Sequence, residues 1–519
     1  MNKKITLISP FSTIHSFGLR CISSCLKKEG FDVNLLFMPI SFTKKYEENV
    51  LNDMIEVSKD SFLIGISTMS NYFDNIVKIT KKIKTELEDT VVVWGGIHST
   101  IKPLECLDYA DAVCIGEGEE SIIELAKKIR NEESYYDTDG IWFNNDGKII
   151  KNVIRPLIQN LDSIPFQDYD YKSHYIIDNH YIKRMDLGLL NKYIEGVYLT
   201  MATRGCPHRC TFCCNNFFNK MYVGQKIVRK RSADNIIKEL LQIKKIAKCI
   251  RFDDDAFCIQ SLEEIKKFSI LYKENIDLPF IVTGATPLTL TRDKLSFLVD
   301  AGLIEIRMGI QTGSKKTQKL YNRQFSNQQI MSVAKIINEF NGKIKPPRYD
   351  IILDNPYETE KELNETLLLL NSLPVPYHLN IFSLVFFPAT EMYDRAKKDN
   401  LITDEINEIY HKSYRTSSNT YYNRLFFLLQ NYAKSNKKIR KNIMELLVNP
   451  KMQRLKLNWL IYYLLYMKSV YYRTKYLSHE FLKDLRHNNL DRIITYIKAT
   501  IMKTNDELTD KIKGEDKRL

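Results

Sequence analysis

The chain of 519 residues has no long apolar run and no recognisable export signal. No stretch reaches the ~18 unbroken apolar residues that a spanning helix needs, which argues against a transmembrane segment. The start, residues 1–9, is too short for a secretory signal and is followed by polar sequence. The ten cysteines are scattered, and without a signal they favour metal chemistry over disulfides. We therefore expect a cytoplasmic protein in which some thiols bind metal.

Acidic residues are in the minority, with 63 against 76 basic residues and a formal net charge of +13. Such a surplus can mark a nucleic-acid partner or an anionic membrane surface. Here much of it consists of single lysines spread along helical patterns, which is the ordinary solvated face of a helix. We expect no nucleic-acid partner. A basic, metal-stabilised nucleic-acid-binding protein is the alternative from another class.

Residues 1–135 alternate short apolar runs with helical patterns. This rhythm predicts βαβ units in a doubly wound, flavodoxin-like parallel sheet. Ligands of such sheets bind beyond the carboxyl ends of the strands, where this sequence has polar, glycine-rich loops. No Gly-x-Gly-x-x-Gly follows the first run, which argues against a dinucleotide. The expected strands are 5–8, 33–37, 62–66, 91–94 and 112–115.

Three cysteines form the most distinctive pattern, a C-x3-C-x2-C array of Cys206, Cys210 and Cys213. The apolar run before it predicts a strand, so the array lies in the loop that leaves the strand end. Three thiolates leave one iron of a four-iron cluster open to a substrate or cofactor. The alternative is a structural zinc site, which usually takes four ligands and would recruit Cys214 or His208.

Residues 196–400 contain six further strand–helix units. Chemistry in barrels built from such units collects at the carboxyl ends of the strands. Three adjacent acids, 253–255, follow the second strand, and a Gly-Ile-Gln-Thr-Gly run at 309–313 ends the fourth. The expected strands are 197–203, 249–254, 279–284, 304–309, 348–353 and 379–386, and the expected helices are 232–247, 261–275, 292–301, 326–340, 358–373 and 390–399.

The cysteine array, with an aromatic residue before its third cysteine, resembles that of the radical S-adenosylmethionine (SAM) superfamily. The resemblance implies a partial (β/α)6 barrel in which the three cysteines hold a 4Fe–4S cluster and SAM binds the open iron. The acids resemble the Phe-x-Asp-Asp-x-Phe motif of the cobalamin-linked branch of this family, and the glycine run resembles its fourth-strand motif. The SAM-binding residues implied by these matches are Phe212, Asp254, Asp255, Gly309, Gln311 and Gly313.

Two loops of the first region, Gly-Gly-x-His-Ser-Thr at 95–100 and Gly-Glu-Gly-Glu at 116–119, resemble those of the cobalamin-binding domain found ahead of many radical SAM domains. His15 matches the histidine of the Asp-x-His-x-x-Gly motif that ligates cobalt in some cobalamin proteins. Thr13 replaces the Asp that normally orients that histidine. The cobalamin-binding residues implied are His15, Ser67, Thr68, Gly95, Gly96, His98, Glu117, Gly118 and Glu119.

The chain is expected to contain four parts: a cobalamin-binding domain (1–135), a connector (136–195), the radical SAM barrel (196–400) and a helical domain (401–519). The segment 161–166 resembles the link seen between the two cofactor domains. The last part carries no strand–helix pattern. Its apolar segment 457–467 predicts a core helix, and the alternative is a peripheral membrane contact.

Together the resemblances, which cover residues 3 to about 400, imply a cobalamin-dependent radical SAM enzyme. Such an enzyme generates a 5′-deoxyadenosyl radical from SAM at the cluster and methylates an unactivated carbon. The substrate would be a small or lipid-like molecule, and an external donor of the flavodoxin or ferredoxin type would supply the electron. The same cofactors can instead catalyse a ring closure, a ring contraction or another radical rearrangement, and no motif distinguishes these outcomes. A methylthiotransferase would need a second cluster, but Cys21 and Cys25 read better as core residues.

Overall fold

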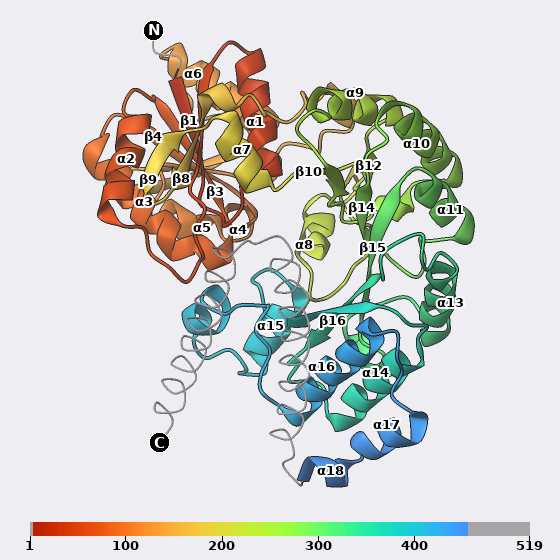
Figure 1. The fold of residues 1–519 in the computed structure, drawn as a ribbon. Helices are drawn as coiled ribbons and strands as arrows, with labels where there is room; N and C mark the ends of the chain where they lie inside the picture. The colour runs from red at the N-terminus through yellow and green to blue at the C-terminus, as the bar shows by residue number, and fades with distance from the viewer. Residues whose placement is uncertain (1–3, 455–519) are drawn as a thin grey trace, which may run out of the picture. The chain divides into compact units, whose positions relative to one another are not determined.

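The structure is a computed structural model that describes residues 4–454 (Figure 1). The described residues fall into two compact units, one of Met1–Ser418 with Gln430–Met444 and one of Asn419–Leu429 with the residues from Glu445. The predicted helix at 457–467 lies outside the described residues. Of the helices within 4–454, none has the length and apolar character that a bilayer-spanning helix requires.

A nine-stranded sheet forms the first half of the larger unit, in the order β7-β6-β5-β4-β3-β1-β2-β8-β9. Its central order β5-β4-β3-β1-β2 is parallel throughout and is that of a flavodoxin-like doubly wound sheet, so the predicted fold is confirmed. The strands are β1 (Lys4–Ser9), β2 (Asp32–Phe37), β3 (Leu63–Thr68), β4 (Val91–Gly96), β5 (Ala112–Cys114), β6 (Ile141–Asn145), β7 (Lys148–Lys151), β8 (His174–Asp178) and β9 (Tyr181–Arg184).

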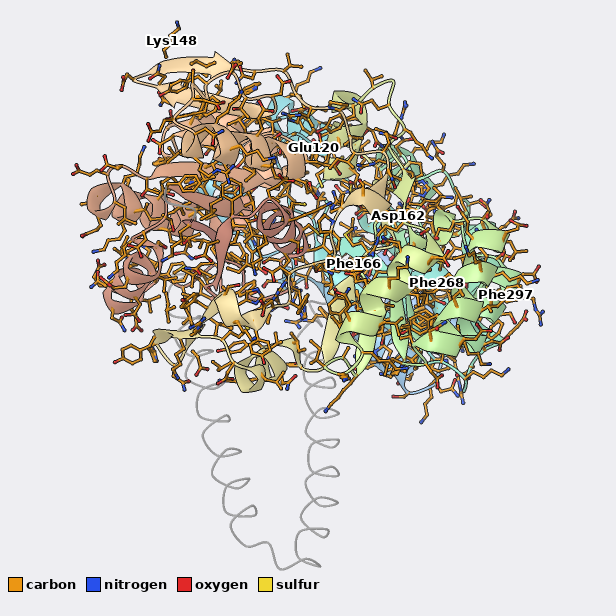
Figure 2. The ribbon with its side chains drawn as sticks, turned by 90° about the horizontal axis from the view of Figure 1, so that it is seen from above. Glu120, Lys148, Asp162, Phe166, Phe268 and Phe297 are labelled. Carbon is orange, nitrogen blue, oxygen red and sulfur yellow. The ribbon has the colours of Figure 1, made fainter. Side chains whose placement is uncertain are left out.

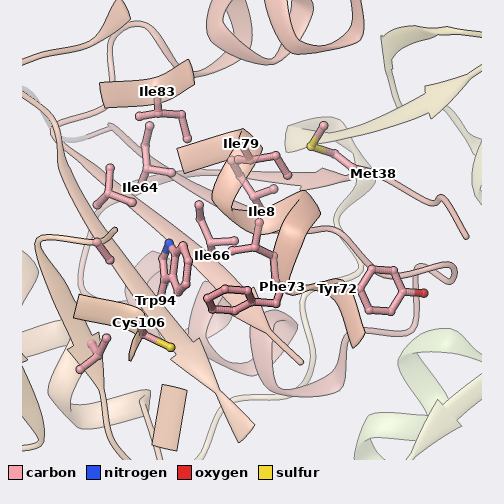
Figure 3. Packing of buried hydrophobic residues seen from close by; sticks show 14 of the residues in the cluster. Ile8, Met38, Ile64, Ile66, Tyr72, Phe73, Ile79, Ile83, Trp94 and Cys106 are labelled. Carbon is pink, nitrogen blue, oxygen red and sulfur yellow. The ribbon is translucent and has the colours of Figure 1, made fainter. Parts of the chain in front are cut away.

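Helices cover both faces of this sheet because successive strand residues point to opposite sides. On one face, Ile8, Ile64, Ile66 and Trp94 pack with residues of α3 in a continuous core (Figure 3). The buried indole N–H of Trp94 donates to Thr80 Oγ1 at 2.9 Å, so its polar atom has a partner. The helices are α1 (Phe17–Lys28), α2 (Glu48–Ser58), α3 (Phe73–Glu86), α4 (Ile97–Ile101), α5 (Pro103–Leu107) and α6 (Glu119–Arg130).

The connector contributes strands to both edges of the sheet. The hairpin β6–β7 turns at Asp146 and Gly147, which both have positive φ, and pairs with β5. The hairpin β8–β9 pairs with β2 through three residues and was not predicted, because its polar and aromatic sequence shows no clear period. Both turn residues of this second hairpin, Asn179 and His180, have positive φ.

The second half of the larger unit is a six-stranded, all-parallel sheet in the order β10-β13-β14-β15-β16-β17. Its two edge strands do not pair with each other, so the predicted partial (β/α)6 barrel is confirmed. The helices α9, α10, α11 and α13 lie around the outside of the strands (Figure 1). The strands are β10 (Val197–Thr200), β13 (Cys249–Phe252), β14 (Phe280–Ala285), β15 (Leu303–Gln311), β16 (Arg348–Leu353) and β17 (His378–Ser383).

Each predicted barrel helix exists within a few residues of its expected bounds. Side-chain caps explain several starts: Ser232, Ser261 and Ser326 each accept a hydrogen bond from a backbone N–H of the first turn. Figure 2 labels Phe268 of α10 and Phe297 of α11 in this outer layer. The helices are α9 (Ala233–Ile243), α10 (Leu262–Asn275), α11 (Arg292–Asp300), α12 (Lys315–Leu320), α13 (Asn327–Asn338), α14 (Glu360–Ser372) and α15 (Glu391–Lys398).

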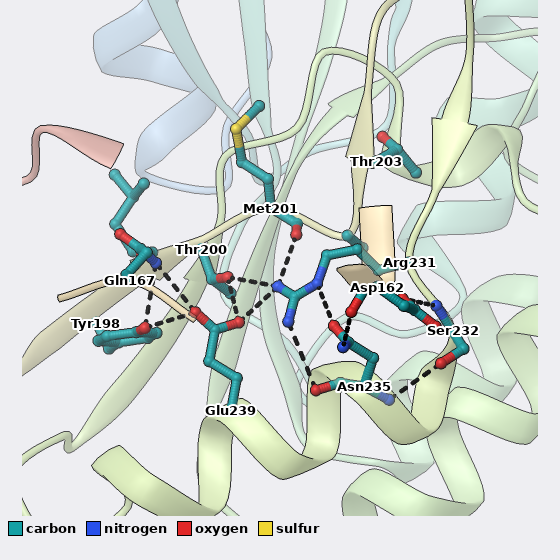
Figure 4. A network of polar contacts seen from close by, with 12 residues as sticks. Asp162, Gln167, Tyr198, Thr200, Met201, Thr203, Arg231, Ser232, Asn235 and Glu239 are labelled. Atoms are coloured by element: carbon teal, nitrogen blue, oxygen red, sulfur yellow. Dashed lines mark hydrogen bonds and ion pairs between the residues drawn. The ribbon is translucent and has the colours of Figure 1, made fainter. Parts of the chain in front are cut away.

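A buried network around Glu239 of α9 fixes the connector to the start of the barrel (Figure 4). Its carboxylate, 2% exposed, accepts hydrogen bonds from Tyr198 Oη at 2.7 Å and from Arg231 Nη1 at 2.5 Å. Gln167 of the connector donates to Glu239 at 3.2 Å. A buried carboxylate needs such partners. The network therefore orients β10, the strand that leads into the cysteine loop.

Beyond the barrel, the described helices are α16 (Tyr421–Lys434), α17 (Lys441–Leu447) and α18 (Pro450–Arg454). This part is helical, as predicted. Tyr421 Oη donates to Leu447 O at 2.8 Å, which joins the start of α16 to the end of α17. The boundaries predicted at 135, 195 and 400 stay predictions.

Candidate functional site

A cavity of about 340 Å³ lies in the larger unit, where the loops after the strands of the first sheet meet the cysteine loop. Apolar side chains such as Leu7, Val93 and Ile122 line part of the cavity. Polar side chains, among them Asn215, Asn219 and Asp255, also line it. Apolar walls with a few polar groups are typical of cofactor sites. Both halves of the larger unit therefore contribute to one binding site.

The three cysteines lie in one loop between β11 (Thr203–Arg204) and α8 (Cys214–Met221). Cys206 and Cys210 are buried, and Cys213 precedes the first residue of α8, with its N–H donating to Cys210 O at 3.1 Å. Burial raises the pKa of the Cys206 thiol to about 12. Iron binds thiolate, so loading this site releases protons.

Among the described residues, no three His, Cys, Asp or Glu side chains form a group that could hold a single metal ion. The thiolates of an iron–sulfur cluster bind separate irons, and they lie further apart than the ligands of one ion do. Three thiolates in one loop can each bind a separate iron of such a cluster. Cys214 and His208, the possible fourth ligands of a zinc site, belong to no such group in this part of the chain.

The segment after α12 supports the cysteine loop from the barrel side. Arg323 Nη1 donates to Cys210 Sγ at 3.2 Å, and Arg323 Nη2 donates to Gly309 O at 2.8 Å. Thr211 N donates to Tyr321 O at 3.2 Å, and the rings of Phe212 and Tyr321 meet edge to face at 4.9 Å. A cation beside a cluster ligand stabilises its negative charge. Arg323 was not predicted from the sequence, because it lies 113 residues from Cys210 and carries no motif of its own.

The two predicted acids after β13 lie in different surroundings. Asp254 is 3% exposed, and its carboxylate accepts hydrogen bonds from Ala202 N at 3.0 Å and from Thr203 N at 2.5 Å. Burial raises its pKa to about 7. Asp255 instead lines the cavity and interacts with Asn215 of α8. Asp254 thus holds the start of the cysteine loop, whereas Asp255 can reach a ligand.

Glycine at the end of β14 lets that strand approach the acids. Gly284 has φ of 72°, and a Cβ there would lie 2.4 Å from Asp254 O. Only glycine fits such a position. The sequence analysis did not identify Gly284, because a single glycine in a strand is a weak signal.

Gln311, at the end of β15, has φ of 70°, a conformation uncommon for a residue with a side chain. Its Oε1 atom is buried and has no hydrogen-bond partner among the described residues. An unpartnered buried oxygen is costly unless a ligand satisfies it. Gly309 lies directly beneath this side chain, and Gly313 N donates to Thr366 Oγ1 at 2.9 Å. The end of β15 therefore fits a polar ligand such as SAM.

Two arginines join the cysteine loop to the Gly116–Glu119 loop of the first sheet. Arg204 donates to Glu117 Oε1 at 3.1 Å and to Glu119 Oε1 at 2.6 Å. Arg229 donates to both oxygens of Glu117 at 2.8 Å. The two arginines face each other across the antiparallel pair of β11 and β12 (Arg229–Lys230). We call Arg204, Arg229, Glu117 and Glu119 the arginine bridge.

The structure divides the predicted cobalamin residues into two groups. Thr68 donates to Gly95 O at 2.9 Å and His98 is fully buried, so neither lines the cavity. His15 does not line it either, although its Nδ1 atom is buried without a partner among the described residues. Six predicted residues do line the cavity: Ser67, Gly95, Gly96, Glu117, Gly118 and Glu119.

The cavity wall has the features expected around a large ligand. Asn219 Nδ2 donates to Cys206 O at 3.0 Å, whereas its buried Oδ1 has no partner among the described residues. Gly116 has φ of 80°, and a Cβ there would lie 1.9 Å from Tyr222 Oη. This glycine lets the two walls approach each other closely. The wall thus offers an unpaired acceptor and a close backbone approach, which fit cobalamin.

We predict that the stability of the fold around the first sheet decreases in acid because of His98. Its ring packs 5.1 Å from that of Phe73 and 5.4 Å from that of Tyr410, and burial lowers its pKa from 6.5 to about 4. Between pH 6.5 and pH 4, His98 of the unfolded chain therefore binds a proton, whereas His98 of the folded chain stays neutral. Stability is complete above pH 6.5 and falls by up to about 3 kcal/mol as the pH drops to 4.

The measurement is the thermal midpoint of the wild-type chain and of His98→Gln between pH 7 and pH 5. The amide of glutamine can keep the hydrogen bond that His98 Nδ1 makes with Ser70 Oγ, at 3.0 Å, but cannot take up the proton. We expect a shallower loss of stability in the variant. An equal slope in both proteins would contradict the role of His98.

Comparisons with known proteins agree with this site. Residues 200–370 match the Radical SAM superfamily, and residues 3–126 match the B12 binding domain. The chain is 25% identical to "Uncharacterized methyltransferase PH0819" of Pyrococcus horikoshii, over 69% of this chain and 74% of that protein. It is also 25% identical to a cytidylyl-2-hydroxyethylphosphonate methyltransferase of Streptomyces wedmorensis, over 61% of this chain and 66% of that protein.

The fold is similar to that of the radical SAM methyltransferase TsrM from Kitasatospora setae, solved with cobalamin and a 4Fe–4S cluster bound. The TM-score is 0.60 at 16% identity, over 77% of this chain and 75% of TsrM. The B12-binding match covers the five parallel strands β1–β5 of the flavodoxin-like sheet, and the radical SAM match covers the cysteine loop and most of the barrel. The chain therefore carries a B12-binding domain ahead of a radical SAM domain, and its cofactors are a 4Fe–4S cluster, SAM and cobalamin.

Proposed function

We propose that the chain is a cobalamin-dependent methyltransferase that methylates an unactivated carbon of a small molecule. The observation that carries this proposal is the cavity shared by the cobalamin-binding loops and the cysteine loop. It would hold the methyl donor beside the site at which the radical is generated. In a protein of this class the cluster and SAM supply a 5′-deoxyadenosyl radical, and the cobalamin supplies the methyl group.

The residues of the chain have distinct tasks in this proposal. Cys206, Cys210 and Cys213 hold three irons, and the hydrogen bond from Arg323 to Cys210 Sγ stabilises charge beside one of them. Gln311 and Asp255 offer polar oxygens to SAM at the mouth of the barrel. Carboxylate and amide oxygens suit the ammonium and hydroxyl groups of such a ligand.

The protein also excludes water from the reaction, which protects a radical from side reactions. Phe218 and Tyr222 of the α8 region, together with Met201, form part of the cavity wall beside the cysteine loop. The cluster is expected to receive its electron from an external protein of the flavodoxin or ferredoxin type. We also propose the cytoplasm as the place where the chain acts, on the basis of its scattered free cysteines.

The test uses full-length protein reconstituted anaerobically with iron, sulfide and hydroxocobalamin. We expect reductive cleavage of SAM to 5′-deoxyadenosine and transfer of isotope from methyl-labelled SAM into a product of a fractionated metabolite extract. Product without label would favour a ring closure, ring contraction or other rearrangement by the same cofactors. Failure to bind iron or to cleave SAM would overturn the enzyme assignment as a whole.

Filling the cavity at Gly95 is expected to abolish cobalamin binding without unfolding the protein. Gly95 lies in the cavity wall with a φ that other residues adopt, and a Cβ there meets only Cys114 Cβ, at 3.7 Å. A Gly95→Phe side chain would occupy space that the cofactor needs. We expect the dissociation constant for hydroxocobalamin, measured by its absorbance change, to rise by at least about tenfold.

Gly95→Ala is the matched control, because it adds one carbon at an ordinary contact distance. It should bind cobalamin within about threefold of the wild type. Circular dichroism and the thermal midpoint establish that both variants fold. If a folded Gly95→Phe protein binds cobalamin as tightly as the wild type, cobalamin does not bind in this cavity.

A further inference from the structure

An open groove of about 840 Å³ lies on the barrel, and five of its ten lining residues are basic. It lies among α12, the loop before α14, α14 itself and α15. Its cations are Lys315, Lys316, Lys319, Lys361 and Arg395, and its acids are Glu362 and Glu365. The groove shares no residue with the cavity that the cobalamin-binding loops line.

Three of the lysines in the groove have no ionic partner in the part of the chain that the structure describes. Lys316 Nζ pairs with Glu362 at 3.4 Å, and Arg395 Nε lies 3.6 Å from Asp399. Within residues 4–454, no ion pair involves Lys315, Lys319 or Lys361, and all three are exposed. Solvated lysines need no partner, but three in one groove create a local positive potential that attracts an acidic surface.

The groove is connected directly to the cysteine loop. Leu320, in its wall, accepts a hydrogen bond from Thr211 Oγ1 at 2.7 Å. Thr211 follows Cys210 in the sequence, and Asn322 Nδ2 donates to Arg209 O at 2.8 Å on the other side of that cysteine. Met392 N of α15 donates to Thr211 O at 3.0 Å. A protein bound in the groove would therefore be separated from the cluster ligands by a single layer of chain.

We propose that this groove is the docking surface for the electron donor, an acidic protein that carries one electron at a time. The proposal rests on the proposed function, which requires an external one-electron reductant. The donor loses one electron and the cluster gains it, so no further oxidant or reductant is needed. The electron would cross near Leu320 and Thr211, where α12 meets the cysteine loop.

The form of the groove suits such a partner. Complexes between electron-transfer proteins bury little surface and form quickly, because the donor must leave after each transfer. Their specificity comes from complementary charge, which steers the encounter and weakens as salt rises. An exposed row of unpaired lysines provides this kind of attraction, whereas a buried apolar patch would hold the donor too long.

The experiment compares two triple variants of the reconstituted full-length protein. The groove variant carries Lys315→Glu, Lys319→Glu and Lys361→Glu. The control variant carries Lys238→Glu, Lys245→Glu and Lys273→Glu, which make the same charge change at exposed positions on the helical outer face of the barrel. Formation of 5′-deoxyadenosine from SAM is measured with reduced flavodoxin and, separately, with dithionite, a small reductant that needs no docking surface.

With flavodoxin we expect the groove variant to be at least about tenfold slower than the wild type, and the control variant to be within about twofold. With dithionite all three proteins should agree within about twofold. The wild-type rate with flavodoxin should fall as salt rises from about 50 mM to about 300 mM, and the groove variant should lose this dependence.

Other results would overturn the docking surface. Equal slowing of the two variants with flavodoxin would show a general effect of charge, and equal slowing of the groove variant with both reductants would show damage to the cluster. An unchanged groove variant would place the docking surface elsewhere. If wild-type protein with dithionite cleaves no SAM, the proposed function itself fails, which is a distinguishable result.

Discussion

Alanine at Cys206, Cys210 or Cys213 is expected to remove the cluster and, with it, all reductive cleavage of SAM. In the proposed site each of these free thiols binds a separate iron of the cluster from one loop. Iron content after anaerobic reconstitution should fall from about four per chain to below one. The rate of 5′-deoxyadenosine formation should fall by at least roughly 100-fold.

Cys214 provides a matched control within the same segment. It is adjacent to Cys213, is also partly buried, and begins α8. If three thiolates hold the cluster, Cys214→Ala should keep the iron content of the wild type and most of its activity. Loss of iron in Cys214→Ala, with iron retained in Cys206→Ala, would favour a different ligand set and would contradict the assignment.

Much of the fold was predictable because its signals are local. Apolar runs bounded by turns marked the parallel strands, and helical patterns marked the helices between them. The hairpin β8–β9 was missed because an edge strand such as Tyr181–Arg184 is half polar and carries little periodic signal. Its position beside β2 depends on contacts with residues more than 130 positions away, and no local pattern reports those.

The sequence predicted which loops form the site, but not which side chains of those loops point into the cavity. Ser67 lines the cavity, whereas Thr68, the next residue, turns inward toward Gly95 and Ser99. Neighbouring residues at a strand end point in opposite directions, and a motif does not say which one meets the ligand. His98 likewise belongs to a recognised motif but packs into the core of the first sheet.

Glu117 and Glu119, the predicted cobalamin contacts, are a second case in which the sequence did not predict what the side chains contact. Both carboxylates are occupied by Arg204, which lies more than 80 residues away. Electrostatic pairs at such a separation leave no periodic trace in a single sequence. In the structure these acids pair with Arg204 beside the cysteine loop, and they line the cavity together with Gly116 and Gly118.

Breaking the arginine bridge is expected to weaken cobalamin binding while leaving the cluster intact. Arg204 is 16% exposed in its side chain and Glu119 only 7%, so Arg204→Met would leave a nearly buried carboxylate without its partner. Loss of one member of a buried ion pair costs about 3 kcal/mol or more. The cysteine loop and the Gly116–Glu119 loop would then separate, and both of these loops line the cavity.

The measurements are the thermal midpoint, the iron content and the dissociation constant for hydroxocobalamin. We expect Arg204→Met to lower the midpoint and raise the dissociation constant by at least about tenfold, with the iron content of the wild type. The exposed pair of Arg292 with Glu339, at 2.7 Å, is the control, and Arg292→Met should match the wild type in all three measurements.

A double-mutant cycle distinguishes the ion pair from simple loss of packing. Glu119 Oε1 accepts a hydrogen bond from Arg204, so Arg204→Met with Glu119→Gln removes the stranded charge together with its partner. The double variant should be more stable than Arg204→Met alone, with a coupling of about 1–3 kcal/mol. If the effects of the two substitutions on stability are additive, the ion pair is not coupled, and the bridge does not set the width of the cavity. The same conclusion follows if cobalamin binds Arg204→Met as tightly as the wild type. If they couple and binding weakens, the acids of the Gly-Glu-Gly-Glu motif act on cobalamin through the position of the cysteine loop rather than by direct contact.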